Sequence, residues 1–189
     1  MKLKFILSMC LGVALGANAQ SFKNAKESKY NFKQVQRLAA SPVESQGRTG
    51  TCWSFSALSF LESEIMRIKK SDEPIVLSEM FIVRKAYEEK AKKYVRMDGR
   101  TNFGEGGAFH DIPFVIKNFG IVPRSVYSGL KKRKDVYNHG SMFDRLDSIV
   151  QQANLSGKGI QAEWLAAYNA ELDNGIGVLP TNFKYKGSN

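Results

Sequence analysis

Cysteine and histidine are scarce in this sequence, with two residues of each. Two cysteines cannot build the disulfide framework of a small secreted scaffold, and the widely separated cysteines and histidines do not form a metal site. We therefore expect no metal and no cofactor. Apolar runs are also short, and none is long enough to span a bilayer stably.

The N-terminal residues have the pattern of a secretory signal peptide. Residues 2–15 hold two lysines and then an apolar run, and Ala17-Asn18-Ala19 follows as a small-residue cleavage site. We expect a signal peptide over residues 1–19, cleavage after Ala19, and export to a periplasm or the exterior. Cleavage removes Cys10 and leaves Cys52 as a single unpaired thiol, which an exported protein usually either uses or buries.

The chain is basic, with a formal net charge of +10, and its 43% hydrophobic residues are enough for a folded core. The densest positive cluster is Lys131-Lys132-Arg133-Lys134. Because no aromatic residues are interleaved with it and no nucleic-acid-binding motif is present, we interpret it as a solvated loop. A basic polyanion-binding protein remains one hypothesis for the chain, and nucleic acid is not an expected partner.

Apolar residues at helical spacing predict five helices. The first begins at Cys52 and stops at Lys69-Lys70, and the second follows an N-cap at Ser78. The other three cover about 110–119, 141–150 with Ser141 as cap, and 161–172 ending at Asn174-Gly175. Residues 176–179 are predicted as a strand.

Cys52 stands where a loop punctuated by glycine becomes the first predicted helix. The unpaired N–H groups and the dipole of a helix N-terminus favour a thiolate by about 0.3–1 kcal/mol. An isolated cysteine is more often a small buried hydrophobe. Gln46, six residues upstream on the same loop, carries an amide N–H that can stabilise an oxyanion, so we interpret Cys52 as a nucleophile.

The string from Gln46 to Phe55 resembles the active-site segment of papain-like cysteine peptidases. Thr49 stands where papain and the cathepsins carry a disulfide cysteine, which makes the chain look more like the bleomycin hydrolase and aminopeptidase C branch. The resemblance continues through Val76–Glu79, Gly104–Gly107 and Gly120–Pro123, and less distinctly to Asn182. It implies an α+β papain-like cysteine peptidase fold.

The resemblance also implies roles for individual residues. Cys52 and Gln46 would be catalytic, as nucleophile and oxyanion donor. Gly106 and Gly107 would bind substrate, since glycines there let an extended peptide approach the main chain, with Ala108 and Phe109 beside the pocket for the adjacent side chain. The partners implied are a peptide substrate and, in a homo-oligomer, further copies in a hexamer.

The catalytic histidine of the resembling enzymes lies in a second, sheet-rich half, and neither His110 nor His139 occupies a matching position. We expect a signal peptide at 1–19, an N-terminal arm at 20–40, and at 41–189 mainly the α-helical half of the fold, elaborated at about 140–175 and truncated before the sheet-rich half. This predicts an aminopeptidase-like cysteine peptidase that is inactive as this fragment. The alternative is a degenerate half that binds peptides or a partner without cleaving them.

Overall fold

The computed structural model describes residues 24–71, 73–132 and 135–185, so the predicted signal segment lies outside the described part. The chain divides into two units, residues 1–37 and 38–189. In the first unit, the side chain of Asn24 bonds both backbone groups of Phe32 and closes a turn. Its apolar residues are exposed, 61% for Phe32 and 96% for Val35, and the described residues of this unit form no helix.

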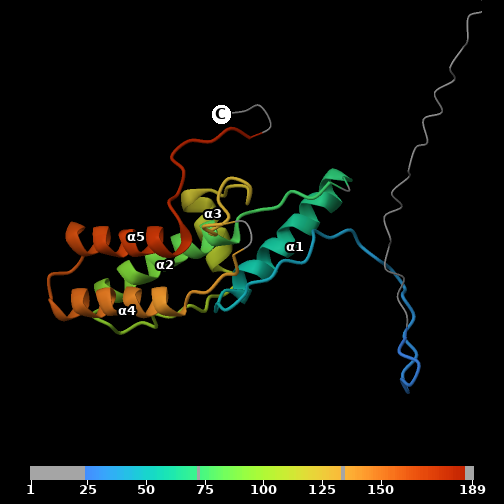
Figure 1. Cartoon of the computed structure of the whole chain (residues 1–189), viewed down its shortest axis with the longest axis horizontal. Helices are drawn as coiled ribbons and strands as arrows, with labels where there is room; N and C mark the ends of the chain where they lie inside the picture. The colour runs from blue at the N-terminus through green and yellow to red at the C-terminus, as the bar shows by residue number, and fades with distance from the viewer. Residues whose placement is uncertain (1–23, 72, 133–134, 186–189) are drawn as a thin grey trace, which may run out of the picture. The chain divides into compact units, whose positions relative to one another are not determined.

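The second unit carries five α-helices (Figure 1). They are α1 (Cys52–Lys69), α2 (Glu79–Arg96), α3 (Asp111–Phe119), α4 (Gly140–Leu155) and α5 (Ala162–Ile176). Helix α2 contacts each of the other four, and Figure 1 shows α4 and α5 beside it with α1 leading away from it. The α2 side chains Met80, Ile82, Val83 and Tyr87 are accordingly fully buried.

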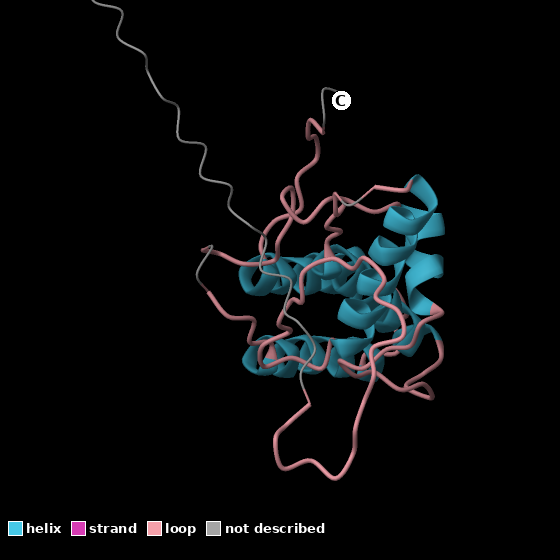
Figure 2. Ribbon diagram, turned by 90° about the vertical axis from the view of Figure 1, so that its right-hand side faces the viewer, coloured by secondary structure: helices cyan, strands magenta, loops and turns pink. Residues whose placement is uncertain are grey.

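Helix and irregular loop make up the described chain, and Figure 2 shows no extended strand in it. Isolated bridges pair Arg48 with Asn138 and Leu77 with Pro123. The predicted strand at 176–179 is wrong, because Ile176 is the last residue of α5 and an irregular segment follows it. No helix in the described part is both long and apolar enough for a membrane span.

The predicted helix starts are largely confirmed. Ser78 accepts a hydrogen bond from the Phe81 N–H at 3.0 Å, as an N-cap does, and Pro113 lies in the first turn of α3, where its missing N–H costs nothing. The prediction for α4 is wrong by two residues. His139, not Ser141, occupies the N-cap position, and no side chain caps that helix.

Helix α5 runs past the stop predicted at Asn174-Gly175, and packing against α4 explains why. A Cβ added at Gly175 would lie 2.1 Å from the sulfur of Met142 and 2.6 Å from its Cγ. Met142 is 2% exposed. Gly175 therefore lies inside α5, where it allows α4 to pack closely, and does not end the helix.

We expect Gly175→Ala to lower the free energy of unfolding by about 1–3 kcal/mol, because Met142 must move out of a packed core. This outweighs the roughly 1 kcal/mol by which alanine is the better helix former. The measurement is urea unfolding followed by circular dichroism. In a Met142→Ala background the same substitution should be neutral or stabilising; an equal loss in both backgrounds would contradict the packing explanation.

Candidate active site

Cys52 is the first residue of α1 and its side chain is exposed. The first turn closes on the carbonyl of buried Thr51, which accepts from the N–H of Ser54 at 2.9 Å and of Phe55 at 3.3 Å. The predicted placement of Cys52 at a helix N-terminus is confirmed. The thiol thus combines access from solvent with the positive end of an 18-residue helix.

Gln46 is half-buried and fixed by its own loop. Its side-chain nitrogen donates to the carbonyl of Thr49 at 2.6 Å, and the Thr49 hydroxyl donates to the Gln46 carbonyl at 2.9 Å. An amide nitrogen carries two N–H groups. The bond to Thr49 therefore orients the side chain of Gln46 and leaves one N–H to donate elsewhere.

On one side, the loop before Cys52 pairs with residues 137–139. The Arg48 N–H donates to the Tyr137 carbonyl at 2.8 Å, and the His139 N–H donates to the Arg48 carbonyl at 3.3 Å. Gly47 has φ of +60°, and a Cβ there would lie 2.5 Å from the Tyr137 oxygen. Only glycine allows both this conformation and this approach.

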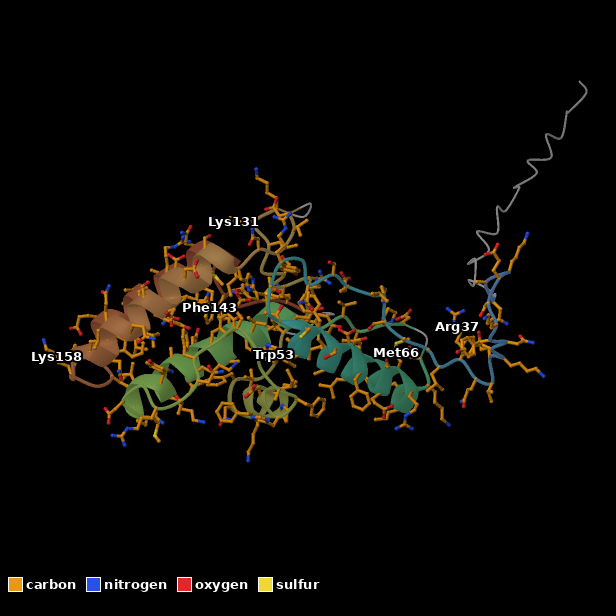
Figure 3. All side chains as sticks on the ribbon, turned by 90° about the horizontal axis from the view of Figure 1, so that it is seen from below. Arg37, Trp53, Met66, Lys131, Phe143 and Lys158 are labelled. Atoms are coloured by element: carbon orange, nitrogen blue, oxygen red, sulfur yellow. The ribbon has the colours of Figure 1, made fainter. Side chains whose placement is uncertain are left out.

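On the other side, Glu105 joins the loop and α1 to the glycine-rich segment. Its carboxylate accepts from the Gly50 N–H, and its carbonyl accepts from the Trp53 indole N–H at 3.0 Å. Lys90 of α2 donates to the Gly106 carbonyl and lies 5.3 Å from the centroid of the Trp53 ring. Trp53, labelled in Figure 3 near the start of α1, is thus contacted by the glycine-rich segment and by α2.

The two glycines predicted to bind substrate have different surroundings. A Cβ on Gly107 would lie 2.6 Å from two carbons of the Trp53 ring, so packing alone requires a glycine there. A Cβ on Gly106 would meet no described atom within 4 Å. Gly106 therefore borders open space. Phe109 is 55% exposed, with its ring centroid 6.2 Å from that of Phe60.

Arg124 links the nucleophile loop to α2. It forms an ion pair with Glu44 at 2.6 Å, lies 3.8 Å from Glu79, and donates to the Tyr137 hydroxyl at 3.3 Å. Burial raises the pKa of Glu79 to about 7, which the positive charge of Arg124 only partly offsets. This cluster had no signal in the sequence, because its members are brought together only by the fold.

The two histidines have opposite environments. The side chain of His110 is 84% exposed and lies 3.5 Å from the Asp111 carboxylate. His139 is buried, which lowers its pKa to about 4. Neither forms a hydrogen bond with Cys52 in the described part of the chain. The described part of the chain also contains no cluster of three or more histidine, cysteine or acidic side chains that could hold a metal ion.

A thiol at a helix N-terminus, with an oriented amide on the preceding loop and a glycine-rich segment bonded to that loop, is an arrangement suited to acyl transfer through sulfur. Comparison with known proteins gives the same class. The family model described as "Papain family cysteine protease" matches residues 27–156. The chain belongs to the papain family, and its described residues form a helical portion of that fold.

Two relatives illustrate the likeness. The chain is similar to the oryzain beta chain of Oryza sativa subsp. japonica, with 31% identity over an alignment of 118 residues. This match covers 57% of this chain and 23% of the relative. Among solved structures it is similar in fold to PepW from Lactobacillus rhamnosis HN001, with a TM-score of 0.53 and 20% identity. That match covers 78% of this chain and 40% of PepW. The chain thus spans less than half of either relative.

The raised pKa of Glu79 predicts how the stability of the protein depends on pH. Its carboxyl keeps a proton in the folded state up to about pH 7 but loses it near 4.5 when unfolded, so stability should fall as the pH rises through this interval. In the wild type, the free energy of unfolding should fall by roughly 2 kcal/mol between pH 5 and 7.5, as measured by urea unfolding. We expect Glu79→Gln to abolish this fall. Glu73→Gln, in an exposed loop, is the control and should keep the wild-type slope. A Glu79→Gln slope equal to wild type would contradict the buried-carboxyl account.

Proposed function

We propose that the chain provides the nucleophile-bearing side of a cysteine peptidase. The Cys52 thiolate attacks the carbonyl carbon of a peptide, forming an S–C bond and a tetrahedral oxyanion. The C–N bond then breaks, and the amine leaves with a proton from a general acid. The observation that carries this proposal is the exposed thiol at the start of α1, preceded on the same loop by the oriented amide of Gln46.

Gln46 and the backbone N–H of Cys52 serve as the oxyanion donors in this proposal. The hydrogen bond to Thr49 supports the role of Gln46, because a preoriented donor need not reorganise as charge develops. Gly106 accepts the main chain of an extended substrate. Its carbonyl already receives Lys90, so substrate pairing uses the remaining lone pair of that oxygen or the free space above the residue.

We infer that the 189-residue chain alone hydrolyses peptides slowly, if its general acid is supplied by residues outside it. Loss of an acid or base typically costs 10²–10⁴-fold in rate. A second candidate function is peptide or partner binding without cleavage. It is favoured by one observation: within the described residues, neither histidine bonds to the thiol.

The finer assignment is to an aminopeptidase-like enzyme of the bleomycin hydrolase and aminopeptidase C branch, which assembles as a hexamer. It rests on the residues quoted above, especially Thr49 in place of a disulfide cysteine. Export is proposed from the signal pattern at 1–19. Together these assignments describe a secreted or periplasmic enzyme that shortens peptides.

A peptide aldehyde tests the nucleophile and the oxyanion donor together. It adds reversibly to a thiol and places an oxygen where the oxyanion forms. It should therefore protect Cys52 from alkylation by iodoacetamide, and peptide mapping measures the extent of that alkylation. We expect Gln46→Ala to weaken this protection by about tenfold or more, while the alkylation rate without aldehyde stays nearly unchanged.

Gln152→Ala, on the exposed side of α4, is the matched control and should behave as wild type. The corresponding peptide alcohol cannot form the thiol adduct and should protect much less. Equal protection by alcohol and aldehyde would support binding without nucleophilic chemistry, and an unaffected Gln46→Ala variant would contradict its role as donor.

Gly106→Val tests the substrate side of the site. Because a Cβ at this position meets no described atom, the folded protein should tolerate valine, while the added methyl groups should obstruct an extended peptide. We expect about tenfold weaker aldehyde protection with an unchanged melting temperature. Gly104→Val is the control, since its nearest contact is an ordinary 3.7 Å from the Asn102 side chain. Equal effects of both variants would argue against substrate binding at Gly106.

A further inference from the structure

The peptide group between Thr49 and Gly50 is held at both of its polar ends. Its carbonyl oxygen accepts from the side-chain nitrogen of Gln46 at 2.6 Å, and its N–H donates to the carboxylate of Glu105. The two contacts act on one rigid unit, because a peptide group is planar and this one is trans. Two consecutive hydrogen bonds therefore join the carboxylate of Glu105 to the amide of Gln46.

The absence of a side chain at Gly50 serves this contact. A Cβ added at Gly50 would lie 2.7 Å from the Cβ of Glu105 and 3.1 Å from its carboxylate oxygen. Gly50 is not among the described glycines that have a positive φ, so the backbone conformation alone does not require glycine there. The close approach of Glu105 does require it.

The backbone that carries this carboxylate is fixed against the first turn of α1. The carbonyl of Glu105 accepts from the Trp53 indole N–H at 3.0 Å, and the next carbonyl, that of Gly106, accepts from Lys90. Trp53 is 7% exposed, and a Cβ on Gly107 would lie 2.6 Å from two carbons of its ring. The side chain of Glu105 thus reaches the nucleophile loop from a backbone that other contacts already hold.

A negative charge at one end of this pair of hydrogen bonds strengthens the bond at the other end. Hydrogen bonds to a carboxylate are stronger than neutral ones, and hydrogen bonds in series polarise one another. The bond from the Gly50 N–H to Glu105 makes the Thr49 carbonyl a better acceptor for Gln46. One N–H of the Gln46 amide is used in that bond, so the direction of the second N–H is set at the same time.

We propose that Glu105 is a positioning residue for the oxyanion donor, acting on Gln46 through the peptide group between Thr49 and Gly50. Glu105 takes no part in bond making or bond breaking. Its effect is confined to the step in which negative charge develops on the substrate oxygen. This inference rests on the peptidase proposal, because it needs Gln46 to serve as the donor.

The same peptide aldehyde and peptide alcohol test this role on the full chain, because only the aldehyde forms the adduct that carries an oxyanion. We expect Glu105→Ala to weaken protection of Cys52 by the aldehyde about threefold to tenfold. Protection by the alcohol, and the alkylation rate without ligand, should stay unchanged. Glu105→Gln keeps an acceptor oxygen and should recover most of the loss, and Glu73→Ala, in an exposed loop, is the control and should match wild type.

A double variant tests whether Glu105 acts through Gln46. If it does, Gln46→Ala combined with Glu105→Ala should weaken aldehyde protection no more than Gln46→Ala alone. Independent contributions from the two residues would instead add.

Amide NMR of the full chain detects the contact itself, without the chemistry of Cys52. The strong bond to a carboxylate should place the Gly50 amide proton downfield. We expect this signal to move upfield in Glu105→Ala and by a smaller amount in Glu105→Gln, while Glu73→Ala leaves it in place.

The role of Glu105 is overturned if Glu105→Ala leaves aldehyde protection or the Gly50 signal unchanged, or if Glu105→Gln recovers nothing. Equal losses of protection by aldehyde and alcohol, or an additive double variant, would also overturn it, because both indicate a merely structural role. Failure of the peptidase proposal looks different, since it appears in the wild type. A wild-type protein that the aldehyde protects no better than the alcohol would overturn that proposal, and the role of Glu105 with it.

Discussion

The pairing of Arg48 with residues 137–139 is the contact on which the arrangement of the candidate site depends. It brings a loop at the start of α1 against the residues that precede α4, nearly a hundred positions later. The approach requires Gly47, which takes a positive φ and lies against the Tyr137 carbonyl. A side chain there would push the two segments apart. It would thereby move the residues between Gln46 and Cys52.

The position of α1 is also set by a second group of contacts, which it makes with the start of α2. The Ser54 hydroxyl donates to the Glu79 carbonyl at 3.0 Å, and the buried carboxylate of Glu62 accepts the Leu77 N–H at 2.7 Å. Both tie α1 to the beginning of α2. Hydrogen bonds to charged groups contribute more to stability than bonds between neutral groups. Removing one partner of such a buried pair is costly, because the other partner is left unsatisfied. The N-terminus of α1, and the thiol on it, therefore rest on a rigid support.

Local patterns predicted the helices and the place of Cys52, because apolar spacing, the Ser78 cap and the glycine-punctuated loop act within a few residues. The contacts of the site were less accessible. Nothing near Glu105 in sequence indicates that its carbonyl receives the Trp53 indole, and Gly175 has the appearance of a helix stop until Met142 is seen against it. These features depend on residues distant in sequence, and local propensity carries no information about them.

Two buried titratable groups, Glu79 and His139, lie on elements that meet the nucleophile loop through Arg124 and Arg48. Their effects on stability have opposite signs. The raised pKa of Glu79 makes the protein less stable as pH rises from 4.5 to 7, whereas the lowered pKa of His139 makes it less stable as pH falls from 6.5 to 4. Apolar residues at both positions would avoid both losses. Near neutral pH the destabilisation by the raised pKa of Glu79 persists, whereas that by the lowered pKa of His139 is largely gone, because its imidazole is then mostly uncharged in both the folded and the unfolded state.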